Sequence, residues 1–157
     1  MLLDTGGSPR REPFEAAAPI LGLQLQFVSV NGPEDVEPAF EAAAREHAEA
    51  IFALVGGAVS SNAPRVAELA IQARLPSMWQ QNEAPGYGGL MAYGANRAAM
   101  FRRAAYYVDR ILKGRSPADL PIEEPREFDF PINLKTAQAL GLTIPQHVLL
   151  QATEVVQ

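Results

Sequence analysis

The sequence predicts an α/β fold, a Rossmann-like three-layer sandwich around a parallel sheet. First, short apolar segments alternate with helical segments at intervals of roughly 25 residues, as in repeated strand–helix–strand units. Second, residues 50–55 are mostly apolar, which is typical of a strand covered on both faces. Third, a chain of 157 residues with 48% hydrophobic residues is long enough for one domain with a real core.

Strands are expected at residues 2–4, 23–30, 50–55, 75–79 and 90–93, and most of them are followed by Gly, Asn or Gln. Helices are expected between them at residues 10–21, 34–48 and 62–73. Ser8 and Pro9 suit the start of the first helix, and Gly22 suits its end. Pro19 predicts a kink or an early end of that helix.

The second half of the chain departs from this rhythm. Residues 97–113 form an amphipathic pattern, with Met100, Tyr107 and Ile111 on one side and Arg102 and Arg103 on the other. A stiff linker follows at residues 116–121, and residues 128–133 alternate like an edge strand, where a proline at position 131 is tolerated. A short helix is expected at residues 134–140, and residues 145–155 are expected to be helical. The chain therefore divides into a Rossmann-like lobe (1–94), a crossing helix with its linker (95–121), and a returning strand with helices (122–157).

Composition excludes several classes of function. A net charge of −5 argues against a nucleic-acid partner, because phosphate binding needs a concentrated basic surface. The absence of cysteine excludes disulfides, thiolate metal sites and cysteine nucleophiles. No stretch approaches the ~20 apolar residues of a membrane span. The sequence as printed shows no export signal, which leaves open a cytoplasmic protein, a mature fragment or the product of a shortened gene.

The expected ligand-binding edge lies beyond the carboxyl ends of the strands, where open parallel sheets bind their ligands. The candidates there are Ser8, Gly57, Ser60, Trp79 and Tyr93. Backbone amides near Gly57 and the Ser60 hydroxyl suit a carboxylate or phosphate, although Ser60 or Ser61 could simply cap a helix. Trp79 could stack on a ligand, or it could pack in the core.

Nothing in these segments indicates an enzyme, a cofactor or a metal. They contain no histidine, no lysine and no nucleophile beside a base, and catalysis by general base or nucleophile needs such a partner. His47 and His147 have no ligand at metal spacing.

Four motifs of the second half carry a family resemblance: Tyr93-Gly94, residues 111–114 (Ile-Leu-Lys-Gly), residues 117–121 (Pro-Ala-Asp-Leu-Pro) and residues 128–145. Together they resemble the C-terminal part of the ABC-transporter substrate-binding proteins that include tryptophan-binding lipoproteins. The resemblance implies a type I periplasmic binding fold with two lobes and a hinge. It also implies a small organic solute such as an amino acid in the cleft, an ABC permease as partner and a periplasmic location.

This chain has room for one such lobe, and the resemblance places the hinge at Tyr93-Gly94. The helix at 97–113 would then be made for a lobe that the sequence does not contain. We therefore expect either a solute-binding lobe or a truncated relic or interaction protein that forms a homodimer through this helix. A third alternative, a flavodoxin-like enzyme or receiver domain, lacks the clustered acids at the strand ends, where only Asp4 stands, and the late lysine of a receiver.

Overall fold

A seven-stranded mixed sheet forms the centre of the molecule in the computed structural model, which describes residues 2–4, 11–54 and 56–157. Its strands are β1 (Leu2–Asp4), β2 (Phe27–Ser29), β3 (Ile51–Ala53), β4 (Ser77–Trp79), β5 (Met91–Ala92), β8 (Pro131–Asn133) and β9 (Glu154–Val156). The spatial order is β2-β1-β3-β4-β5-β8-β9, and the first five strands are parallel to one another. This confirms the predicted α/β class and parallel sheet, in the 2-1-3-4-5 order of doubly wound folds.

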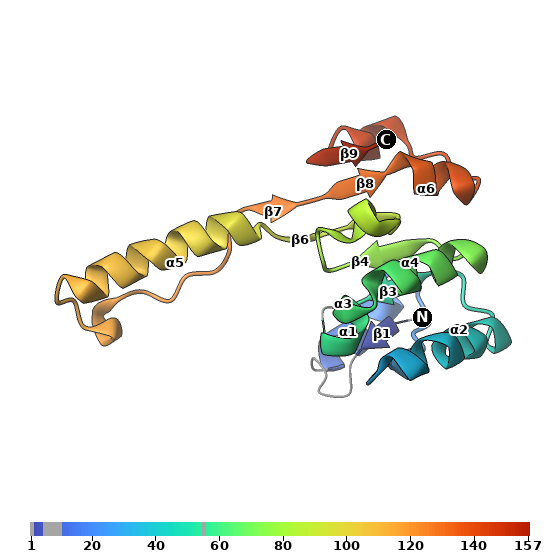
Figure 1. Ribbon diagram of the computed structural model, residues 1–157, viewed down its shortest axis with the longest axis horizontal. Helices are drawn as coiled ribbons and strands as arrows, with labels where there is room; N and C mark the ends of the chain where they lie inside the picture. The colour runs from blue at the N-terminus through green and yellow to red at the C-terminus, as the bar shows by residue number, and fades with distance from the viewer. Residues whose placement is uncertain (1, 5–10, 55) are drawn as a thin grey trace.

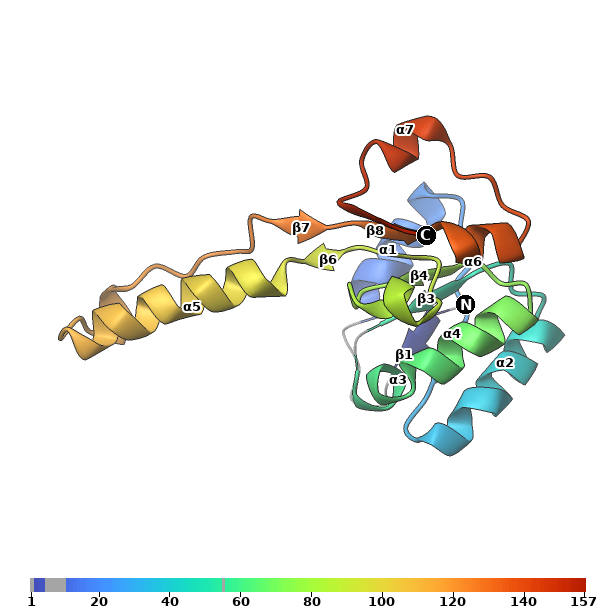
Figure 2. The same ribbon diagram turned by 45° about the horizontal axis from the view of Figure 1, so that its top comes forward.

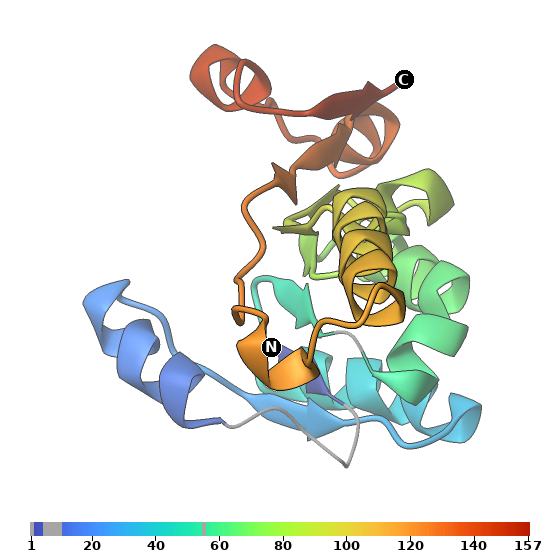
Figure 3. The same ribbon diagram turned by 90° about the vertical axis from the view of Figure 1, so that its left-hand side faces the viewer.

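Helices cover the two faces of this sheet unequally. On one face lies α1 (Glu12–Ile20), whose Phe14 ring contacts the ring of Phe52 edge-on at 5.9 Å between centroids. On the other face lie α2 (Val36–Arg45) and α4 (Ala63–Gln72), as Figure 3 shows. The short elements η1 (Pro33–Asp35), α3 (Gly57–Ser61) and η2 (Ala84–Tyr87) complete the connections. Pro19 lies inside the last turn of α1, which ends at Ile20, one residue before the expected end.

The main hydrophobic core lies between the sheet and the α2–α4 face. Strand residues Ile51, Ala53 and Trp79 meet Phe40 of α2 and Val66 of α4 there, and all five are buried. The alternate strand positions, which point to the α1 face, are only partly buried in β3 and β4. This difference follows from the period of two in a strand, which sends neighbouring side chains to opposite faces.

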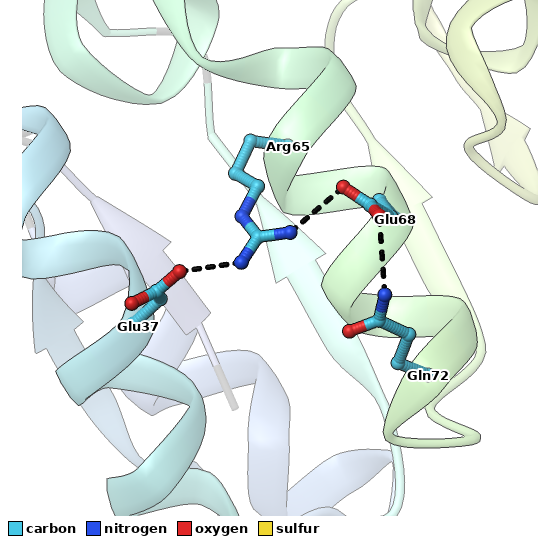
Figure 4. Close-up of polar contacts among 4 residues, drawn as sticks. All are labelled: Glu37, Arg65, Glu68 and Gln72. Carbon is cyan, nitrogen blue, oxygen red and sulfur yellow. Dashed lines mark hydrogen bonds and ion pairs between the residues drawn. The ribbon is translucent and has the colours of Figure 1, made fainter.

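A surface network ties α2 to α4 (Figure 4). Arg65 of α4 donates to Glu37 of α2 and to Glu68, whose other oxygen accepts from the Gln72 amide at 3.1 Å. Hydrogen bonds to the two carboxylates raise the pKa of Arg65. Because these side chains are exposed, the network contributes little to the stability of the lobe.

The chain leaves the lobe after β5 and forms a long arm, residues 97–127 (Figures 1 and 2). The hinge is a two-strand ladder of β6 (Gly94–Ala95) and β7 (Phe128–Asp129), from which α5 (Arg97–Leu112) projects. After the turn η3 (Pro117–Asp119) the chain runs back beside α5, so residues 122–127 accompany the crossing helix. No residue of α5 is buried, and within the described residues the returning chain is the part that lies against this helix.

The C-terminal segment returns to the lobe and extends its sheet. It contains α6 (Leu134–Ala139) and α7 (Gln146–Leu149). The expectation of a helical segment over 145–155 is wrong beyond Leu149, because residues 154–156 pair with β8 as β9. The edge-strand assignment for Pro131 is also wrong: β8 lies between β5 and β9. Pro131 is tolerated because it is the first residue of its strand.

Candidate ligand-binding edge and hinge

The carboxyl ends of β1, β3, β4 and β5 share one edge of the sheet, since these strands are parallel. The arm leaves from this same edge, because β6 follows β5 after a single residue (Figure 1). Loops at this edge therefore face the space beside the arm. Four of the five predicted site residues fall here within the described residues, and Ser8 lies outside them.

Gly57 and Ser60 lie in α3, directly after β3. A Cβ atom added to Gly57 would meet nothing within 4 Å, so its backbone faces open space. The Ser60 hydroxyl Oγ is buried and has no hydrogen-bond partner in the described part of the chain. The structure does not support the capping alternative, because neither α3 nor α4 has a side-chain cap. Ser60 thus contributes a buried hydroxyl without a described partner close to the exposed backbone of Gly57.

Trp79 packs in the core and is not exposed at the strand-end edge. Of the two alternatives left open by the sequence, ligand stacking and core packing, the structure has the second. Its side chain is only 1% exposed and belongs to the core on the α4 face. The indole Nε1–H donates to Ser77 Oγ at 2.9 Å, and Ser77 Oγ also accepts from the Leu90 amide at 3.1 Å. The physical reason is register: Trp79 points to the same face as Ser77, and the loop at Gly89 packs directly against its ring.

Tyr93 is the exposed aromatic residue of this edge. Its ring is 52% exposed and stacks on Phe128 at 5.5 Å, nearly parallel, with Phe130 edge-on at 6.2 Å. Its amide donates to the carbonyl of Trp79 at 2.9 Å, which fixes the backbone. Sequence reasoning missed the two phenylalanines as site residues. The sequence signal that could have found them is the alternation Phe128-Asp129-Phe130 at the start of the family motif at residues 128–145.

A polar hinge cluster of Asn82, Asn96 and Asp129 lies next to these rings. The Asp129 carboxylate accepts from Asn82 Nδ2 at 3.1 Å and from Asn96 Nδ2 at 2.9 Å. Asn82 Nδ2 also lies 3.1 Å from the carbonyl of Ala95. A small hollow of about 280 Å³ opens beside the cluster, lined also by Thr153 and Glu154. No sequence signal pointed to these residues as a unit.

A larger apolar groove, about 830 Å³, runs between α5 and the returning chain. Its walls include Met100, Tyr107 and Ile111 of the helix and residues 121–127 opposite. Tyr107 Oη donates to the Pro121 carbonyl at 2.7 Å, and Arg103 Nε donates to Glu123 at 2.8 Å. The bond to Arg103 lowers the pKa of Glu123 and raises that of Arg103. These two hydrogen bonds hold the returning chain against α5, and the apolar surface of the groove between them and the rest of the helix remains open.

The described residues contain no group of three or more His, Cys, Asp or Glu side chains placed to hold a metal ion. No helix in these ranges is long and apolar enough to cross a membrane. The edge offers hydrogen-bonding groups and an exposed aromatic ring.

Comparisons with known proteins agree with this architecture. The sequence model of the family "ABC transporter substrate binding protein" matches residues 8–156. A conserved domain protein from Vibrio cholerae is 27% identical, with a TM-score of 0.88 over 98% of this chain and 53% of its own.

Two further solved structures share the fold. An ABC domain from Streptococcus pneumoniae, solved with L-Trp, has a TM-score of 0.88 at 24% identity and matches 99% of this chain and 54% of its own. A ligand-free, open substrate-binding protein with adhesive properties from Clostridium difficile has a TM-score of 0.71 at 17% identity. The match covers 99% of this chain and 53% of that protein's chain. No match was found among curated proteins.

This chain therefore spans about half the length of the solved proteins it resembles. The fold is that of a single lobe of a periplasmic binding protein, as the sequence predicted. The chain belongs to the ABC transporter substrate-binding protein family.

Proposed function

We propose that this chain is one lobe of the solute-binding component of an ABC-type uptake system. In this proposal a small organic solute lies between the carboxyl ends of its strands and a second lobe covering the arm. The observation that carries the proposal is that the arm, in a chain of this family, leaves from the strand-end edge of the lobe and has an open apolar groove along it. Ligands of open α/β sheets bind beyond the carboxyl ends of the strands.

The residues of the edge suit an amino acid. Tyr93 and Phe128 offer a stacked aromatic surface, and Ser60 offers a buried hydroxyl without a partner in the described structure. Gly57 offers an exposed backbone that a carboxylate can approach. One structure with this fold was solved with L-Trp, so aromatic amino acids are the first solutes to test. We propose Ser8 as a further contact on the basis of sequence alone.

The proposal includes an ABC permease as partner and a location outside the cytoplasmic membrane. Both follow from membership in the family, whose members deliver solutes to such permeases. We propose no catalytic role, because the described strand-end loops offer hydrogen bonds and aromatic contacts without a nucleophile–base pair.

A thermal-shift panel of the twenty amino acids tests the proposal on the purified chain. A ligand at 100 times its Kd adds about 2.7 kcal/mol to stability. For a domain of this size that raises the Tm by ~5–11 °C. Tyr93→Ala and Ser60→Ala should abolish the shift.

Tyr87→Ala is the matched control, because Tyr87 is 50% exposed and precedes Gly88, whose carbonyl accepts from Thr136 of α6, away from the strand-end edge. A shift that survives Tyr93→Ala but not Tyr87→Ala would place the ligand elsewhere. No shift with any amino acid would contradict solute binding by this lobe alone.

A second candidate function is that of an interaction protein that pairs with itself through α5. Seven of the sixteen large hydrophobic side chains exposed among the described residues lie on the arm, so burial of the arm is favourable. Charge also favours the pairing: residues 97–115 hold six basic side chains and one acidic, whereas residues 11–96 hold ten acidic and four basic. A basic helix of one copy can therefore approach the acidic lobe of another.

Light scattering at tens of micromolar, roughly where weak obligate dimers remain associated, tests this candidate. A homodimer gives twice the monomer mass, and Ile111→Glu on the apolar side of α5 should restore the monomer. Asp119→Ala, at the exposed tip of the arm, should leave the mass unchanged. A monomeric wild-type chain would overturn the pairing without affecting the solute proposal.

A further inference from the structure

The arm joins the lobe through very little backbone structure. The chain crosses twice, outward through β6 and inward through β7, and the ladder between them has only two residue pairs, Gly94↔Asp129 and Ala95↔Phe128. An isolated two-stranded ladder is marginally stable in water even when it is longer than this. Since α5 itself is unburied, something other than helix packing must fix the direction of the arm.

The hinge cluster provides this fixation from three sides. Asn82 comes from the loop after β4 and so belongs to the lobe, whereas Asn96 directly precedes the arm and Asp129 lies on the returning strand. One carboxylate accepts from both amides, at 3.1 and 2.9 Å. Hydrogen bonds to an ionised carboxylate are roughly twice as strong as those between neutral groups.

Asn82 also binds the outgoing strand itself. Its Nδ2 lies 3.4 Å from the carbonyl of Gly94 and 3.1 Å from that of Ala95. At Gly94 the backbones come so close that an added Cβ would lie 2.5 Å from the Gln80 carbonyl and 2.7 Å from Asn82 Oδ1. Glycine is therefore required for the strand to reach the amide.

Asn96 passes this constraint on to the helix. The side-chain Oδ1 of Asn96 accepts from the backbone N–H of Ala99 at 2.7 Å, so Asn96 caps α5. The backbone N–H of Asn96 donates to the carbonyl of Glu127 at 2.9 Å. The side chain that caps the helix thus also holds the carboxylate of the returning strand. The first turn of α5, both crossing strands and the lobe form one hydrogen-bonded unit.

We infer that Asp129, Asn82 and Asn96 act as a clamp that sets the direction of the arm relative to the lobe. This inference deepens the proposed function, because the direction of the arm decides where the second lobe stands across the cleft. The three are positioning residues: they hold the geometry of the cleft and do not themselves contact the solute. The clamp acts without ligand, since all its contacts lie within this chain.

Distance measurement between two spin labels tests the clamp directly. The natural chain has no cysteine, so Leu112→Cys at the exposed end of α5 and Glu41→Cys on the exposed side of α2 give two unique labelling sites. We expect one narrow distance distribution in the otherwise unchanged chain. Asp129→Ala and Asn82→Ala should each lose that narrow peak and give a broad distribution.

Two further variants separate positioning from folding. Asn96→Ser keeps a helix-capping oxygen but loses the donor to Asp129, so it should broaden the distances while the far-UV spectrum stays the same. Asp119→Ala removes an exposed carboxylate from the arm tip and should keep the narrow peak. A narrow peak retained in both Asn96→Ser and Asn82→Ala would overturn the clamp. Because no solute is added, this outcome is independent of whether the lobe binds one.

Discussion

Replacement of Trp79 by phenylalanine tests the correction that places this residue in the core. The side chain is 1% exposed, and its Nε1–H donates to Ser77 Oγ at 2.9 Å. The lost hydrogen bond costs about 1 kcal/mol, at the low end because Ser77 Oγ still accepts from the Leu90 amide. The missing part of the indole ring costs about 1–2 kcal/mol more in lost burial and residual cavity. We therefore expect Trp79→Phe to lower the free energy of unfolding by ~2–3 kcal/mol.

Urea unfolding followed by far-UV circular dichroism measures this loss without needing tryptophan fluorescence. The slope with urea should stay the same, so that the change in midpoint reports stability alone. The Tm should fall by ~4–12 °C for a domain of this size. Tyr87→Phe, an exposed aromatic position, should stay within about 0.5 kcal/mol of the natural chain. A loss below about 1 kcal/mol in Trp79→Phe, combined with lost solute binding, would refute the core assignment and restore Trp79 to the ligand site.

Three more outcomes follow from single contacts. Asn133→Ala should cost ~2–4 kcal/mol in urea unfolding, because the buried amide donates to the Pro85 carbonyl at 2.7 Å and caps α6. Gly94→Ala should cost ~1–3 kcal/mol, because its Cβ would collide with the Gln80 carbonyl, whereas Gly57→Ala in open space should not. The carboxyl of Glu123 should titrate below its usual range by NMR, and Arg103→Met should return its pKa to that range. Since the folded pKa of Glu123 lies below the unfolded value, its contact with Arg103 contributes stability above the unfolded pKa and loses it as the pH falls through the folded pKa. An unchanged Glu123 titration in Arg103→Met would contradict the assigned cause.

The parallel part of the sheet could be predicted because its signals are local. Each strand is a short apolar run with a turn after it, and each helix between strands has its own apolar face. Family resemblance then identified α5 as a crossing helix, and the structure shows it uncovered within the described chain. Pairing at the far side of the sheet is not local. Residues 154–156 pair with β8, which offers them an edge. Val155 and Val156 favour a strand locally, but two residues are too short a signal to predict the pairing.

The site was harder to predict for the same reason. Trp79 stands at a strand end, and its burial depends on the loop at Gly89, ten residues later, which packs against its ring. The hinge cluster joins Asn82 to Asp129 across 47 positions, so no spacing in the sequence reveals it. Tyr93 could be chosen because it directly precedes the hinge glycine in a recognisable motif. Its stacking partner Phe128 could not, because it arrives only after the whole arm has been traversed.

The order in which the polypeptide is made determines when β8 and β9 can cover the edge of the sheet at β5. β8 and β9 complete the sheet beside β5, and both leave the ribosome after β1 to β5. Until then the β5 border of the nascent sheet presents unpaired amides and carbonyls, a surface on which other chains can add a strand. A translation product that stops before residue 131 would keep that border exposed, so it should yield aggregates rather than a smaller folded lobe.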